Sequence, residues 1–178
     1  MPKYIAFLRA INVGGHTVKM DYLRSLLESL GLLNVETFIA SGNVIFDSRT
    51  KNAASVARKI EKHLKEMLGY EVITFIRTIE EVAEVAKHKP FPEAELTADG
   101  NVLYVGFLMA EPDKQAKAKL ISLSNEVNDF HFHGRELYWL RRTQAGESEY
   151  AGQLFEKKLC QPMTFRNVTT VRKIAAKY

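Results

Sequence analysis

The order of predicted strands and helices occurs twice along the 178 residues of the chain. Alternating apolar residues indicate strands, and apolar residues three or four positions apart indicate helices. By these criteria the first half contains a strand, a helix, two strands joined by a tight turn, a helix and a strand: Lys3–Ile11, Met20–Leu30, Asn34–Ser41, Asn43–Ser48, Asn52–Leu68 and Tyr70–Arg77. This βαββαβ order is that of a ferredoxin-like plait. A further helix, Ile79–Lys87, follows, with Thr78 and Glu81 placed as a capping box.

The same order begins again in the second half. Its predicted elements, up to a last helix that starts at Val168, are Asn101–Met109, Asp113–Ser124, Asn128–His133, Arg135–Arg142, Tyr150–Leu159 and Met163–Phe165. Two short segments also correspond: Ser41-Gly42-Asn43 with His133-Gly134-Arg135, and Arg77-Thr78 with Arg166-Asn167. We therefore predict an α+β fold of two tandem ferredoxin-like subdomains related by internal duplication.

A segment without periodicity separates the two halves. Residues 89–100 contain Pro90 and Pro92, which is typical of a linker. The predicted organisation is therefore a first subdomain with its extra helix over 1–88, a linker over 89–100, and a second subdomain with a C-terminal helix over 101–178.

The first strand of the chain is apolar on both of its faces. Tyr4, Ala6 and Leu8 alternate with Ile5 and Phe7. A single plait needs only one apolar sheet face, the one that its two helices cover. The pattern predicts that the second face is covered too, by the other subdomain or by a second subunit, and it leaves the oligomeric state open.

The composition excludes several classes of protein. With 46% hydrophobic and 26% charged residues, the chain is neither disordered nor of low complexity. No apolar run approaches the roughly 20 residues that a membrane helix needs, and Arg9 interrupts the N-terminal apolar stretch too early for a signal peptide. The lone Cys160 cannot form an internal disulfide, so we expect a cytoplasmic protein without a membrane partner. A net charge of +4 is compatible with nucleic-acid binding without arguing for it.

The plait topology brings two polar segments to one edge of the first sheet. In the strand order 4-1-3-2, the end of the first strand, the turn into the third strand and the start of the first helix lie together. A helix N-terminus attracts anions, and glycines let a backbone come close to a ligand. The candidate binding residues for a small anion are Arg9, Asn12, Gly14, Gly15, Lys19, Ser41, Gly42 and Asn43.

These residues also have an ordinary structural interpretation. Asn12 and Asn43 can cap turns, the glycines can supply positive φ angles, and Arg9 can form a structural ion pair. Turn formation explains each of these residues singly, but it does not explain why they lie together at one edge of the sheet. The segment Gly14-Gly15-His16-Thr17-Val18-Lys19 matches neither a P-loop nor a dinucleotide fingerprint.

Arg166 and Asn167 form a second, weaker candidate site. Asn167 with Thr170 is first of all a helix N-cap, and Arg77 with Thr78 occupies the same place in the first half. This equivalence favours a structural role for the pair.

Metal and nucleophile chemistry receive little support from the sequence. His131 and His133 share one face of a strand, but no third ligand is spaced near them, so we predict no metal site and no cofactor. Cys160 has no visible histidine partner that would make it a nucleophile.

Three segments resemble those of one family. They are Leu8–Gly15 (LRAINVGG), Thr37–Phe46 (TFIASGNVIF) and Thr164–Thr170 (TFRNVTT), and their pattern is similar to that of the mainly bacterial domain of unknown function 1697. The resemblance extends over essentially the whole chain and implies two ferredoxin-like subdomains, but no established activity, ligand or catalytic residue. Ala10 stands where this family usually has glycine, and Val168 where it usually has tryptophan.

The functional expectation is a protein that binds a small phosphate- or carboxylate-bearing ligand at the first sheet edge, with catalysis left open. One alternative is a nucleic-acid-binding plait that uses the basic C-terminal end; the third strand, Asn43–Ser48, lacks the basic and paired aromatic positions of RNA-binding plaits, so nucleic acid is not favoured. Another alternative is a structural or interaction protein without a small ligand.

Overall fold

The computed structural model describes residues 1–39 and 42–178. They form two compact units, Met1–Ala83 with Tyr178, and Glu84–Lys177. Within the described residues the fold is mixed α and β, with one four-stranded antiparallel sheet in each unit. No helix in this part of the chain combines the length and the apolar character needed to cross a membrane.

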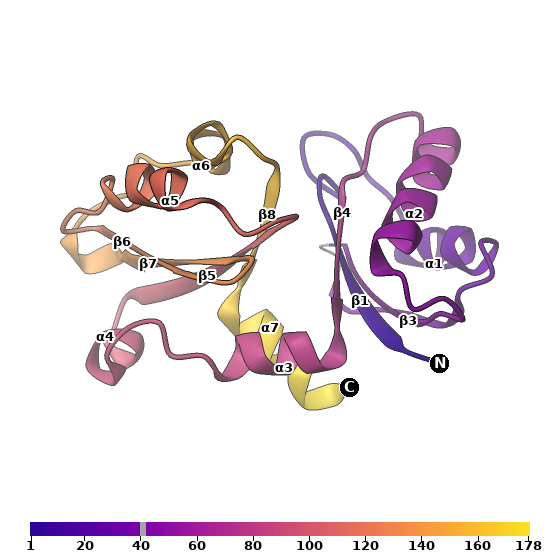
Figure 1. Cartoon of the computed structure of the whole chain (residues 1–178), viewed down its shortest axis with the longest axis horizontal. Helices are drawn as coiled ribbons and strands as arrows, with labels where there is room; N and C mark the ends of the chain where they lie inside the picture. Colours follow the sequence, from indigo (N-terminus) through magenta and orange to yellow (C-terminus); the bar gives the residue numbers. More distant parts are fainter. Residues whose placement is uncertain (40–41) are drawn as a thin grey trace. The chain divides into compact units, whose positions relative to one another are not determined.

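The first unit places two helices on one face of its sheet (Figure 1). Its elements are β1 (Lys3–Leu8), α1 (Met20–Glu28), β2 (Leu33–Thr37), β3 (Asn43–Asp47), α2 (Ala53–Leu68) and β4 (Thr74–Thr78). The strands lie in the order β2-β3-β1-β4, so β1 is central and β4 is an edge strand. The core between sheet and helices contains Tyr4, Leu27, Phe46, Ile60 and Leu64.

Local sequence signals fix the ends of two helices around β4. The Asn52 side chain accepts a hydrogen bond from the Ser55 amide at 3.0 Å at the start of α2, and Gly69 ends this helix with φ +82°. The capping box at the start of α3 (Ile79–Lys87) is confirmed: Thr78 and Glu81 exchange two hydrogen bonds, of 2.8 and 3.1 Å.

The second unit repeats this strand order as β6-β7-β5-β8. Its elements after α3 are α4 (Glu93–Thr97), β5 (Asn101–Leu108), α5 (Lys114–Ile121), β6 (Asn128–His133), β7 (Glu136–Arg142), the 3₁₀ turn Thr143–Ala145, α6 (Gly152–Leu159), β8 (Met163–Asn167) and α7 (Val168–Lys177). Helices α5 and α6 lie on one face of the sheet (Figure 1). The core beneath them is aromatic and centres on Trp139 and Phe155, whose ring centroids are 5.0 Å apart.

Both faces of the central strands are buried. On β1, Ile5 and Phe7 are as fully buried as Ala6 and Leu8, which face the helices. On β5, Val105 and Phe107 are likewise buried. The apolar side chains on both faces therefore contribute to the core, as the sequence pattern indicated.

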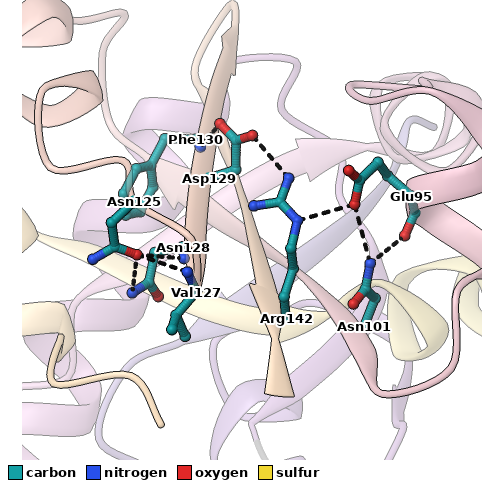
Figure 2. A network of polar contacts seen from close by, with 8 residues as sticks. All are labelled: Glu95, Asn101, Asn125, Val127, Asn128, Asp129, Phe130 and Arg142. Carbon is teal, nitrogen blue, oxygen red and sulfur yellow. Dashed lines mark hydrogen bonds and ion pairs between the residues drawn. The ribbon is translucent and has the colours of Figure 1, made fainter. Parts of the chain in front are cut away.

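The range expected to be a linker, 89–100, contains the short helix α4. Five residues are too few for a periodic pattern, so the sequence signal was absent. Figure 2 shows what anchors this helix: Arg142 of β7 donates to Glu95 at 3.0 Å and to Asp129 at 3.1 Å. The Asn101 side chain also donates to the Glu95 carbonyl at 2.7 Å (Figure 2). The hydrogen bond from Arg142 holds the pKa of the Glu95 carboxyl below its usual value.

Candidate functional site

The end of β1 lies between two other segments of the first unit. The Leu8 amide donates to the Gly42 carbonyl at 2.8 Å, and the Arg9 amide donates to the Ile73 carbonyl at 2.9 Å. Asn43 is the register partner of Phe7. The structure thus brings Arg9, Gly42 and Asn43 together at one end of the sheet. Ser41, the other hairpin residue in the candidate set, lies outside the described residues.

Gly42 is pressed against the end of β1. Its φ is +77°, and a Cβ at this position would lie 3.0 Å from the Leu8 carbonyl oxygen and 3.1 Å from the Ile11 Cβ. Backbone and Cβ atoms cannot move away easily, so only glycine fits here. Gly42 therefore has a packing role at this edge.

Two asparagine side chains hold the loops in place. The buried Asn43 amide donates to the Phe38 carbonyl at 2.9 Å, across the β2–β3 connection. Asn12 has a backbone φ of +58°. Its side chain accepts a hydrogen bond from the Val18 amide at 2.7 Å, and this bond closes the loop between β1 and α1 at its base. Both hydrogen bonds agree with the structural interpretation of these residues.

Within that closed loop, residues 13–17 are exposed. Gly14 and Gly15 have φ angles of +60° and +83°, and no heavy atom of residues 1–39 or 42–178 lies within 4 Å of the position that a Cβ would take on either residue. Among the described residues, these glycines are therefore needed for backbone conformation and not for packing.

The loop leads into the N-terminus of α1 at Lys19. The N-cap residue of this helix, Lys19, is exposed and makes no side-chain cap hydrogen bond to the first-turn amides. Those amides carry a partial positive charge. The carboxylate of Asp21, in the first turn, is 3.4 Å from the Arg24 guanidinium.

This loop also contacts the segment after α2, a contact that the sequence did not predict. The His16 ring stacks on Tyr70, with centroids 3.9 Å apart. The Tyr70 hydroxyl is buried and has no hydrogen-bond partner in the described part of the chain, and burial raises the pKa of this phenol. The two residues are far apart in sequence, so no local pattern could have linked them.

A cavity of about 330 Å³ lies in the first unit, between α2 and the segment that leads into β4. Its lining includes Arg58, Lys62 and Ile73. Because the Ile73 carbonyl accepts from the Arg9 amide, this cavity adjoins the β1 end. The residues that line it were not among the sequence candidates.

In the second unit, Arg166 is a buried structural cation. Its guanidinium donates to the Thr164 hydroxyl and to the Phe165 carbonyl, both at 2.8 Å, and burial lowers the pKa of Arg166 to about 10. Arg77 occupies the equivalent register position, opposite Ile5, and is also buried. Asn167 accepts from the Thr169 amide at 2.9 Å and caps α7, as the sequence predicted for it.

Three histidines meet in the second unit. The Nε2 atoms of His88 and His131 are 3.3 Å apart, and the rings of His88 and His133 stack with centroids 4.1 Å apart. Burial lowers the pKa of His88, with further lowering by His133 and His131. Burial and His133 also lower the pKa of His131, against a smaller opposite effect of Asp129. The sequence pattern on β6 predicted that His131 and His133 share one face. It did not predict the third histidine, His88, which lies 43 residues before His131.

These pKa shifts predict that acid destabilises the protein. The unfolded chain binds protons at His88 and His131 more tightly than the folded chain, so stability falls as the pH drops below the ordinary histidine value of 6.5. We expect urea unfolding with a chelator present to show lower stability at pH 5.5 than at pH 7.5. The loss should be smaller in His88→Gln, while His63→Gln, which leaves the cluster intact, should follow the wild type. An equal loss in His88→Gln would contradict this assignment.

Other reactive groups are sparse. Among residues 1–39 and 42–178, no three histidine, cysteine, aspartate or glutamate side chains are arranged to hold one metal ion. Cys160 is exposed at the end of α6, with its thiol 3.7 Å from the Lys157 carbonyl.

Comparison with known proteins points to one family and one fold. The model of a family described as "Protein of unknown function (DUF1697)" matches residues 1–138. The solved structure of the conserved bacterial protein SP0830 from Streptococcus pneumoniae is similar over 99% of this chain and 97% of that chain, at 25% identity and a TM-score of 0.72. Among curated proteins, none matches the sequence. The matches thus agree with the architecture and supply no activity.

Proposed function

Because the chain belongs to DUF1697, a family of proteins of unknown function, we propose its role from geometry alone: it binds a small phosphate- or carboxylate-bearing molecule where the β1–α1 loop meets the β2–β3 hairpin of the first unit. This proposal concerns binding and leaves catalysis open.

One observation carries the proposal. Gly14 and Gly15 lie shortly before α1 with no described heavy atom beside their Cβ positions, and the N-cap residue of α1, Lys19, makes no side-chain cap hydrogen bond. Among the described residues this arrangement leaves room, and helix N-terminal amides as hydrogen-bond donors, for an anion. A turn at Gly14 and Gly15 requires their positive φ angles, but it does not require open space beside the two residues.

Each residue of the proposed site has a chemical role. Arg9, half-buried at the end of β1, would supply a planar fork for two oxygen atoms, and Lys19 would add a mobile charge. Asn12, Gly42 and Asn43 would hold the two loops and would not contact the ligand. Ser41 remains in the proposed set as a hydroxyl donor.

We also propose that each unit is a ferredoxin-like plait and that the two arose by duplication. The identical strand orders of the two sheets support this proposal. So do the equivalent buried arginines, Arg77 opposite Ile5 and Arg166 opposite Val105.

A plait that binds RNA by base stacking has less support. Such proteins expose aromatic side chains on their two central strands. Here the face of β1 and β3 that lies away from α1 and α2 carries Phe7 and Ile45, and both are buried. We therefore keep nucleic acid as an outcome of the test and not as a second proposal.

The test is a thermal-shift screen of pyrophosphate, citrate and a short RNA at 50 and 200 mM salt. A small anion at about 100 times its Kd should add roughly 2.7 kcal/mol of stability, a shift of several degrees. Arg9→Ala and Gly15→Ala should abolish the shift. Arg24→Ala, a cation further along α1, and Gly31→Ala, an equally open glycine at φ +81°, should retain it.

Two outcomes would overturn the proposal. One is the absence of any shift with small anions, or a shift that survives both Arg9→Ala and Lys19→Ala. The other is a loss of several kcal/mol of stability in ligand-free Arg9→Ala, since Arg9 would then be structural. A shift seen only with RNA at low salt would support nucleic-acid binding instead.

A further inference from the structure

The histidine cluster of the second unit contains a pair of nitrogen atoms that match a metal site. The Nε2 atoms of His88 and His131 are 3.3 Å apart. Zinc binds histidine nitrogen at about 2.0–2.1 Å in tetrahedral geometry, which puts two ligand nitrogens about 3.3 Å from each other. The same separation also permits an N–H···N hydrogen bond between neutral rings, and the Zn²⁺ titration below distinguishes the two.

The surroundings hold these two rings in place. His133 stacks on His88 with ring planes 17° apart, and the Tyr138 ring centroid lies 5.1 Å from that of His88. On the other side, the Phe91 ring meets His131 edge-on at 6.2 Å. A metal-ligating imidazole needs a fixed orientation, which a hydrogen bond to its second nitrogen usually provides and which ring packing provides here.

The site is also reachable and its charges are compatible with a cation. Neither His88 nor His131 is fully buried. Asp129 lies two residues before His131 on β6 and acts electrostatically on its ring, although this carboxylate also pairs with Arg142 at 3.1 Å. The nearest lysines in sequence to His88 are engaged with carboxylates, Lys87 with Glu84 at 4.0 Å and Lys89 with Glu93 at 2.9 Å.

We propose that His88 and His131 bind one divalent transition metal ion of the zinc class through their Nε2 atoms. Imidazole pairs favour Zn²⁺, Cu²⁺ and Ni²⁺ over Mg²⁺ and Ca²⁺. Because the described residues offer two ligands here, water would complete the coordination sphere and the ion would be exchangeable. This site lies in the second unit and does not depend on the anion site proposed for the first.

The test is titration of the full chain, purified without a histidine tag, with ZnCl₂ in a calorimeter after chelator treatment. We expect one Zn²⁺ per chain, and at least a tenfold weaker Kd in His88→Gln and in His131→Gln. His63→Gln is the matched control and should bind as the wild type does, because His63 contacts Ser29 in the first unit and lies outside the cluster.

A measurement on the unmutated protein guards against variants that fail to fold. The NMR signals of the His88 and His131 rings should shift on addition of Zn²⁺, and those of His16 and His63 should not. Absence of Zn²⁺ binding by the wild type, binding that survives both His88→Gln and His131→Gln, or ring shifts confined to other histidines would each overturn the proposal.

Discussion

Replacing Phe155 with alanine should lower the free energy of unfolding by about 3–5 kcal/mol. The ring is fully buried in α6 and lies among four other aromatic rings, with centroids 5.0 Å from Trp139, 5.3 Å from Phe130, 5.8 Å from Phe165 and 6.1 Å from Tyr150. Several of these contacts are edge-to-face, so alanine loses both the burial and the aromatic pairing. Urea denaturation followed by tryptophan fluorescence measures the effect, since Trp139 is the only tryptophan and touches the substituted ring.

Two further variants separate the packing effect from other causes. Phe155→Leu keeps most of the volume and should cost about 1.5 kcal/mol or less. Ile121→Ala removes a side chain that is 44% exposed on α5 of the same unit, and its effect should stay within about 0.5 kcal/mol. A loss below about 1 kcal/mol in Phe155→Ala would show that the aromatic cluster does not stabilise this unit as its burial indicates.

Gly42→Ala should be the most damaging change at the candidate anion site, lowering the free energy of unfolding by about 2–5 kcal/mol. A left-handed φ of +77° costs about 1–2 kcal/mol for any residue with a Cβ. The new methyl group would also meet the Leu8 carbonyl oxygen at 3.0 Å, and relieving such overpacking typically adds 1–3 kcal/mol. Circular dichroism during urea denaturation measures the total, and hydrogen exchange of the β1 amides reports the local loss.

Gly31→Ala is the matched control for this prediction. Gly31 has φ +81° and no heavy atom within 4 Å of a Cβ position, so its substitution carries the conformational cost alone. The difference between Gly42→Ala and Gly31→Ala is therefore the cost of the close approach to β1. Equal losses in both variants would mean that the hairpin can move away from β1, contrary to the packing described above.

The sequence was most informative where side-chain periodicity was long. Apolar stripes in α2 and the alternation in β1 and β5 predicted the element order and, through topology, the meeting of Arg9 with Gly42 and Asn43. Local capping signals such as Thr78 with Glu81 were also readable, because they depend on residues three positions apart. These predictions rest on geometry that the chain carries locally.

Contacts between distant segments could not be predicted in this way. The pairing of His16 with Tyr70 and of His88 with His131 depends on loop paths that no short pattern encodes. Helix α4 was not predicted because no apolar stripe marks it in the sequence. It is held instead by the ion pair of Glu95 with Arg142 of β7, residues 47 positions apart. The roles of Asn12 and Asn43 are a similar case, since an asparagine that closes a loop and one that binds a ligand have the same sequence signature.

The hydrogen bond from the Val18 amide to the Asn12 side chain separates the stability of the sheet from the conformation of the exposed loop. Because this bond closes the loop at its base, substitutions at the exposed Val13 and Thr17 should leave β1 and α1 undisturbed. Loss of the Asn12 side chain should instead release the whole segment 13–17 and, with it, the path of the chain into α1.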